Sequence, residues 1–312
     1  MRISRYFNYD IHGIVKARSN IQLPDILPPF FEVKSTSRPD LTVNVGDFLP
    51  PERGVYRECG LFAFRLKLWV GDLLDSAKVF FNTPMGFSRP IVFDVIKGVL
   101  QFKLLRKGYS FIHGACLSKE GEGILLVAPP ETGKTFTTLL LSKQGFEFLS
   151  DDMTIINGKR GRCYPIPLTL HSYHIRELGI EAKGVSKLKL LMSDLSIPPL
   201  SYGFKLQPED LRLKVVKEAE IVRIYYLERG GEEVRKLKED IALRRLLSAG
   251  RMHIKLFENE HILQYFYLEG VNIWELMKVQ RAIIEELAEG CESYLVKGTP
   301  KTYGKQILSS LL

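Results

Sequence analysis

The sequence of residues 123–135 is GILLVAPPETGKT, and it decides the fold of the chain around it. Residues 123–127 form a short run that is apolar throughout, which is typical of a central β-strand. Residues 128–135 match the pattern GxxxxGK[ST], except that Ala128 replaces the first glycine. A helical pattern follows around residues 138–141 and ends near Gly145. The order strand, loop, helix is the setting in which this pattern binds phosphate groups.

The loop at 128–135 carries the chemistry of a P-loop, also called a Walker A motif. N–H groups at the start of a helix have no partner within the helix, so they can bind phosphate oxygens. Lys134 supplies a cation for the β- and γ-phosphates, and the Thr135 hydroxyl can ligate Mg²⁺. The predicted cofactors are therefore ATP or GTP, with Mg²⁺. The residues expected to contact the nucleotide are Pro130, Glu131, Thr132, Gly133, Lys134, Thr135 and Phe136.

Two adjacent carboxylates, Asp151 and Asp152, follow the next predicted strand at 146–149. The helix before this strand must carry the chain back, so the strand is expected to be parallel to 123–127 in the same sheet. Its carboxyl end then lies at the same edge as the loop, where open α/β sheets bind their ligands. Two carboxylates at that edge can serve a metal and a proton.

His113 is placed at the same edge by strand register. Residues 109–117 read as a strand that returns as 123–127 after a turn at 119–122. If the turn is centred between Glu120 and Gly121, the residue numbers of two residues that pair across the antiparallel strands add up to about 241. His113 then lies opposite Ala128, where it could bind a γ-phosphate oxygen, ligate a metal or tune the base.

Together, His113-Gly114-Ala115, the loop at 128–135 and Asp151-Asp152 resemble the catalytic core of HPr kinase/phosphorylase, which is similar to the nucleotide domain of PEP carboxykinase. The resemblance covers residues 109–160 strongly and the rest of 90–312 more weakly. It implies an α/β fold with a P-loop kinase core and a β-rich N-terminal domain. It also implies roles: Lys134 binds the β- and γ-phosphates, Thr135 and Asp152 hold Mg²⁺, Asp151 is the base toward an acceptor hydroxyl, and His113 lies near the transferred phosphate.

Two domains are expected: a β-rich N-terminal domain at 1–88 and an HPr-kinase-like nucleotide-binding catalytic domain at 89–312. Apolar and polar residues alternate at 41–45 and 64–68, which is the period of a half-buried strand. A turn-rich joint follows at 82–90, and helical periodicity begins at Val92. For residues 1–88 the sequence leaves both substrate docking and self-association into a homo-oligomer open.

The composition of the chain limits the classes of partner that it is expected to bind. The chain has 312 residues and a formal net charge of +8, which favours anionic partners. It carries no signature of a nucleic-acid-binding module and no apolar run long enough to cross a bilayer. We therefore expect neither a nucleic acid nor a membrane as partner.

The four cysteines of the chain form no CxxC pair, which argues against a zinc site or a disulfide framework. The N-terminus lacks the apolar region of a signal peptide, so a cytoplasmic protein is expected.

The leading hypothesis is an ATP-dependent, Mg²⁺-dependent phosphotransferase that moves a γ-phosphoryl group to a hydroxyl of a small molecule or of a protein serine. The glycine-rich loop that HPr kinases carry after the Asp pair is replaced here by Tyr164-Pro-Ile-Pro167, so the acceptor is left open. The alternative is a regulatory protein that binds a nucleotide without turnover, since residues 128–131 of the loop are not glycine. A third hypothesis, carboxykinase-like chemistry on an oxo acid, needs a more elaborate substrate site.

Overall fold

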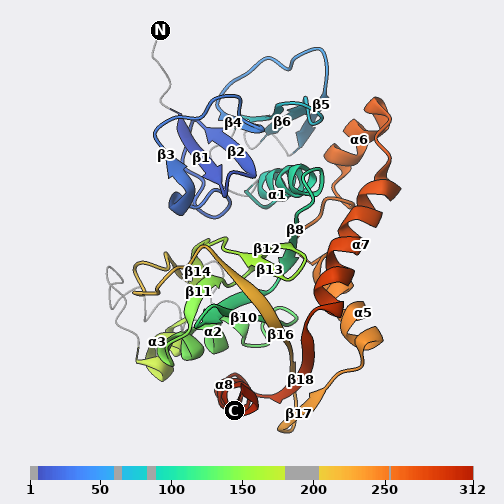
Figure 1. The fold of residues 1–312 in the computed structure, drawn as a ribbon. Helices are drawn as coiled ribbons and strands as arrows, with labels where there is room; N and C mark the ends of the chain where they lie inside the picture. The colour runs from blue at the N-terminus through green and yellow to red at the C-terminus, as the bar shows by residue number, and fades with distance from the viewer. Residues whose placement is uncertain (1–5, 60–64, 83–88, 180–203, 253, 312) are drawn as a thin grey trace. The chain divides into compact units, whose positions relative to one another are not determined.

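The computed structural model describes residues 6–59, 65–82, 89–179, 204–252 and 254–311 (Figure 1). It is a mixed α/β fold with a seven-stranded, a nine-stranded and a two-stranded sheet. The chain divides into two compact units, one of residues 1–111 and 251–282 and one of residues 112–250 and 283–312. Across the described ranges, none of the helices is both long enough and apolar enough to cross a bilayer.

The first unit is built on the seven-stranded sheet, whose order is β3-β1-β2-β4-β7-β6-β5. Its strands are β1 (Phe7–Ile11), β2 (Val15–Ser19), β3 (Glu32–Val33), β4 (Leu41–Val45), β5 (Val55–Cys59), β6 (Leu66–Gly71) and β7 (Ala77–Phe81), with a 3-10 turn at Pro29–Phe31. The strand predicted at 41–45 is confirmed as β4. The strand predicted at 64–68 begins two residues later, as β6.

Helices α1 (Arg89–Leu105) and α6 (Glu260–Glu269) also belong to the first unit. Helix α1 contacts β2, β7 and α6. It buries Val92, Val95, Ile96 and Val99, the apolar positions that predicted it. The boundary expected between residues 88 and 89 therefore falls inside this unit, because α1 packs on the strands that precede it. Residues 83–88 of the turn-rich joint lie outside the described residues.

The second unit is built on the nine-stranded sheet, whose main path is β11-β9-β10-β16-β13-β12-β8, with β18 beside β16 and β17 beside β18. Its strands are β8 (Ser110–His113), β9 (Ala115–Lys119), β10 (Glu122–Val127), β11 (Glu147–Ser150), β12 (Met153–Asn157), β13 (Arg160–Arg162), β16 (Glu218–Arg229), β17 (Glu233–Lys236) and β18 (Glu292–Gly298). Strands β14 (Leu168–Leu170) and β15 (Phe204–Leu206) form the two-stranded sheet. The helices are α2 (Lys134–Lys143), α3 (Ser172–Leu178), α5 (Glu239–Ala249) and α8 (Pro300–Leu311), and α7 (Ile273–Glu289) contains the division between the units.

The predicted register is confirmed for residues 115–119 and 122–126, but the expected pair of His113 with Ala128 is not formed, because His113 lies in β8, which pairs with β12. Leu126 pairs with Ala115, and Glu122 pairs with Lys119. The strand predicted at 109–117 is interrupted at Gly114, whose N–H donates to the carbonyl of Asp152 at 3.1 Å. Strand β8 ends before this glycine and β9 begins after it, so the two segments pair with different partners.

Four strands end at one edge of the nine-stranded sheet. Strand β11 is antiparallel to β9, and β9 is antiparallel to β10, so β11 is parallel to β10 as predicted. Strand β16 is parallel to β10, and β18 is parallel to β16. Buried side chains of β10 and β16 pack with Leu141 of α2 and with Tyr303 and Ile307 of α8 in one apolar core. This core fixes the start of α2 at the edge where the parallel strands end.

Candidate functional site

The loop between β10 and α2 requires glycine at position 133. Gly133 precedes the helix with φ +112°, a conformation that favours glycine. A Cβ atom at this position would also lie 2.4 Å from the Cγ of Pro300. Thr137 Oγ1 donates to the carbonyl of Gly133 at 3.0 Å. Both the backbone conformation and the close packing therefore explain the glycine of the motif.

The exposed outer part of the loop is strained. Glu131 has φ +61°, in the left-handed region, although it carries a side chain. The carbonyl of Glu131 accepts a hydrogen bond from Nη2 of Arg229, the last residue of β16. Strained backbone of this kind clusters at ligand-binding sites and persists because its surroundings hold it. Arg229 is the residue that holds it here.

Lys134 extends from the first turn of α2 into a buried polar cluster. Its Nζ lies 2.9 Å from Nε2 of His113 and 3.8 Å from Oδ1 of Asp152. Nδ1 of His113 lies 3.1 Å from the same Asp152 oxygen. The side chain of His113 is only 3% exposed, whereas that of Asp152 is 35% exposed. Asp152 is thus more exposed to solvent than His113 and Lys134.

Asp151 has a different neighbour. Its Oδ2 accepts a hydrogen bond of 2.7 Å from Thr135 Oγ1, the motif hydroxyl. Its Oδ1 is buried and makes no hydrogen bond of standard geometry within the described part of the chain. The two adjacent carboxylates therefore face two different groups, with Asp151 on Thr135 and Asp152 on His113 and Lys134.

Burial shifts the pKa values of Lys134 and Asp151 in opposite directions, in each case toward the neutral form. Burial lowers the pKa of Lys134, although Asp152 and Asp151 partly offset this. Burial raises the pKa of Asp151, against the lowering effect of Lys134 and of the Thr135 hydrogen bond. Groups that are costly to bury and paired in a defined geometry are typical of functional sites.

The structure brings together His113, Lys134, Thr135, Asp151 and Asp152, as the sequence predicts. The remaining residues expected to contact a nucleotide lie around them: Pro130 and Glu131 are exposed and Thr132 is buried. The side chain of Phe136 points elsewhere, because it packs with Leu139 and Phe148 in a separate apolar cluster. At Phe136, the group left for a nucleotide is therefore its backbone N–H.

An aromatic cluster of His171, Tyr173 and His174 lies beside the loop. The ring of His174 on α3 is 6.1 Å from that of Phe136, and the ring of Tyr173 stacks on His174 at 4.0 Å. His171 stacks on Tyr173 at 5.8 Å. Burial raises the pKa of Tyr173, with a lowering effect of Arg229 and a raising effect of Glu131, so this ring lies within electrostatic range of the loop. Tyr173 is 40% exposed.

His174 is held neutral in this cluster. Its Nδ1 accepts the backbone N–H of His171 at 3.0 Å, and burial lowers its pKa to about 4. The unfolded chain protonates first as the pH falls, so the stabilising contribution of His174 is complete above pH 6.5 and is lost between about pH 6.5 and 4.

His174→Phe keeps a ring at this position but removes the titration. We expect the difference in free energy of unfolding between wild type and variant to shrink by about 1 kcal/mol between pH 6.5 and 5.5. Urea unfolding followed by circular dichroism at these two pH values measures it. A difference that is the same at both pH values would contradict a neutral buried His174.

The residues around Asp151 fit a Mg²⁺ ion that also binds nucleotide phosphates. The described ranges contain no group of three or more His, Cys, Asp or Glu side chains arranged to hold a metal alone. Mg²⁺ is commonly bound by one or two carboxylates together with substrate phosphates and water. The Thr135 hydroxyl and the buried Asp151 Oδ1 supply oxygens of the required kind.

Comparison with known proteins identifies no family for this chain. No model of a known protein family matches it, and no curated protein matches it. A solved structure titled "Structure of the Hpr(Ser) kinase/phosphatase from Coxiella burnetii" matches 41% of this chain and 77% of that chain, with 16% identity and a TM-score of 0.24. This is a distant similarity of fold.

Proposed function

We propose that this protein is an ATP-dependent phosphotransferase with a P-loop kinase core. The observation that carries the proposal is the convergence of Lys134, Thr135, Asp151, Asp152 and His113 at the start of α2. N–H groups of the loop and the first helical turn would bind phosphate oxygens, and Lys134 would bind the β- and γ-phosphates. Such a site works by positioning the reactants and stabilising charge.

In this proposal the acceptor hydroxyl attacks the γ-phosphorus, the bond from that phosphorus to the β-γ bridging oxygen breaks, and ADP leaves. Asp152 accepts the hydroxyl proton, because its carboxylate is partly exposed and lies against His113 and Lys134. His113 orients Asp152 and Lys134, since its two ring nitrogens face them. The acceptor is a hydroxyl of a small molecule or of a protein serine.

The geometry favours an assignment of the two carboxylates opposite to the one that the family resemblance implies. Thr135 is the motif hydroxyl for Mg²⁺, and it is bound to Asp151 and not to Asp152. We therefore place Mg²⁺ with Thr135 and Asp151, and the base at Asp152. Mg²⁺ bound there would offset the negative charge of the phosphates.

The aromatic cluster on α3 is a suitable platform for the nucleobase. Phe136 belongs to the first turn of α2, and its ring leads through His174 to Tyr173, which is 40% exposed. Stacking of a base on an aromatic side chain contributes about 1–3 kcal/mol and accepts either purine, so ATP and GTP both fit.

Tyr173→Ala tests the platform. We expect the dissociation constant for ATP to rise about tenfold, because a stacked base loses its partner, while that for tripolyphosphate stays unchanged. Tyr173→Phe keeps the ring and should bind ATP like the wild type. Calorimetric titration of both ligands measures this. Equal losses for ATP and tripolyphosphate would place Tyr173 on the phosphates and not on the base.

Binding without turnover is the second candidate function, and one feature of the loop favours it. Pro129 and Pro130 have no N–H to offer to phosphate, and Glu131 places a carboxylate next to it. A loop of this kind can hold a nucleotide less closely than a glycine-rich one.

Labelled ATP separates the two functions. The protein is incubated with Mg²⁺, γ-labelled ATP and a cell extract split into small-molecule and protein fractions, with Lys134→Ala as the control. Label that moves into one fraction, and does not move with the variant, supports the kinase and gives its acceptor class. Label that stays in ATP despite measurable ATP binding supports the regulatory protein.

A further inference from the structure

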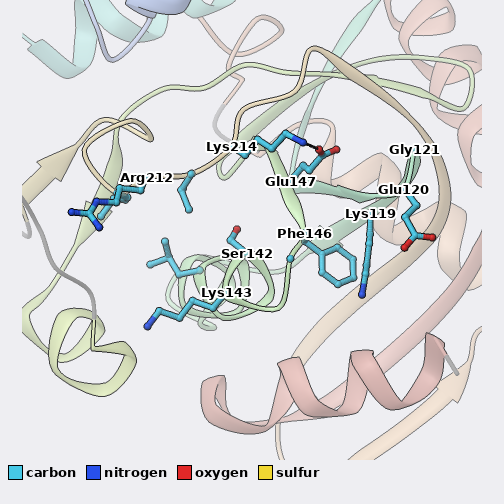
Figure 2. Close-up of a pocket in the computed structure, with 13 residues that line it drawn as sticks. Lys119, Glu120, Gly121, Ser142, Lys143, Phe146, Glu147, Arg212 and Lys214 are labelled. Atoms are coloured by element: carbon cyan, nitrogen blue, oxygen red, sulfur yellow. Dashed lines mark ion pairs between the residues drawn. The ribbon is translucent and has the colours of Figure 1, made fainter.

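A cavity of about 780 Å³ lies at the opposite end of α2 from the loop (Figure 2). It is bordered by the end of α2, the β9–β10 turn, the start of β11 and the segment 211–214. The ten residues of α2 span about 15 Å, so the cavity is a separate place from the phosphate-binding loop. Its volume is within the range of about 300–1,000 Å³ that is usual for sites of small molecules.

The floor of the cavity is apolar. Leu139 of α2, Phe146 and Leu211 are buried, and Leu213 is partly exposed beside them. The wall opposite α2 is fixed to the sheet, because the N–H of Phe148 donates to the carbonyl of Lys214 at 2.8 Å. The floor and this wall are thus parts of the folded core.

The rim carries an excess of positive charge. Four cationic side chains line the cavity against two carboxylates, namely Lys119, Lys143, Arg212 and Lys214 against Glu120 and Glu147. Lys214 and Glu147 form an ion pair with each other. Among the described residues, no carboxylate lies within ion-pair distance of Lys143, whose ammonium donates to the carbonyl of Leu178 and keeps further donors available.

Two further features point to a ligand. The hydroxyl of Ser142 is buried and has no hydrogen-bond partner among the described residues, and Figure 2 shows it directed from α2 toward the Glu147 side of the cavity. Arg212 has φ +56°, a strained conformation for a residue with a side chain. Two of the last carbonyls of α2, those of Leu141 and Ser142, accept N–H groups of residues 144–146.

We propose that this cavity binds a small amphipathic anion, with an aromatic or aliphatic body on the leucine and phenylalanine floor and a carboxylate, sulfonate or phosphate group at Lys143. The proposal does not depend on nucleotide binding, because no residue that lines the cavity belongs to the loop.

The test uses two fluorescent probes with the same aromatic body. 8-Anilinonaphthalene-1-sulfonate carries an anionic group, and N-phenyl-1-naphthylamine lacks it. The full-length protein is titrated with each probe, as wild type and as the Lys143→Glu, Ser142→Phe and Lys305→Glu variants. Lys305 is an exposed lysine of α8 outside the cavity, so its variant has the same charge change. Circular dichroism confirms that each variant is folded, and Lys143→Gln replaces Lys143→Glu if it is not.

We expect Lys143→Glu to weaken the binding of the sulfonate probe at least about tenfold, since a charge-assisted contact is lost. The binding of the neutral probe should not change. Ser142→Phe, which fills the cavity, should weaken the binding of both probes. Lys305→Glu should weaken the binding of neither probe. The proposal is overturned if Ser142→Phe changes neither probe, because the binding then lies elsewhere, for example at the exposed Trp274 and Tyr267. It is also overturned if Lys143→Glu and Lys305→Glu weaken the sulfonate probe equally.

Discussion

Lys134→Ala should reduce phosphoryl transfer by at least about 10³-fold, the largest effect expected of any single substitution in this protein. The ammonium of Lys134 is buried with its contacts already oriented toward His113 and Asp152, so no other side chain can move a cation into the same place at low cost. Its removal also leaves Asp151 without the cation that lowers its pKa, so that carboxyl becomes harder to ionise.

The measurement is the initial rate of γ-phosphate transfer, with the dissociation constant for ATP determined in parallel. Lys305→Ala is the matched control, because Lys305 is exposed on α8 and should leave both quantities unchanged. Transfer by Lys134→Ala at the wild-type rate would show that the active site is elsewhere.

Asp152→Asn should lower kcat by about 10²–10⁴-fold while the dissociation constant for ATP changes little. The amide has nearly the same shape as the carboxylate and keeps an oxygen near His113, but it cannot take the proton of the acceptor hydroxyl. A loss confined to kcat identifies Asp152 as the base. A loss confined to ATP binding would identify it as a metal or phosphate contact.

Asp151→Asn is the contrast that separates the two carboxylates. Its loss of activity should be partly overcome by a higher Mg²⁺ concentration, because the substitution weakens the ion's oxygen ligand beside Thr135. In the wild type, the raised pKa of Asp151 means that it takes up a proton at a higher pH than an ordinary carboxyl. The Mg²⁺ requirement should therefore rise as the pH falls. If Asp152→Asn shows this Mg²⁺ dependence and Asp151→Asn does not, the roles are reversed.

Local patterns were enough to predict the centre of this site. The short turn after β9 set the register of β9 and β10. His113 lies just before β9, and its ring contacts Lys134 although the strand pair predicted for it is not formed. The parallel direction of β11 placed the Asp pair at the same edge. Each of these inferences spans fewer than about 40 residues, and the chain has little conformational choice over such a distance when strand and helix periods are clear.

The rest of the site could not be read in this way. Arg229 and Tyr173 reach the loop from β16 and α3, and nothing in their own surroundings in the sequence distinguishes them from ordinary surface residues. The assignment of the two carboxylates depends on which way each side chain turns at the end of β11. The grouping of α1 with the first sheet depends on its packing against β2 and β7, which its own periodicity does not specify.

The contact between Gly133 and Pro300 has a consequence for biosynthesis. The loop lies against a proline that the ribosome adds long after β10 and α2 have been made, and β18 must first pair with β16 to bring that proline into place. Such long-range pairing is the slow part of folding. A nascent chain that has all the residues of the motif therefore still lacks the wall against which the loop packs. The site acquires its final shape only after residues 292–311 have left the ribosome, so incomplete chains are expected to be inactive.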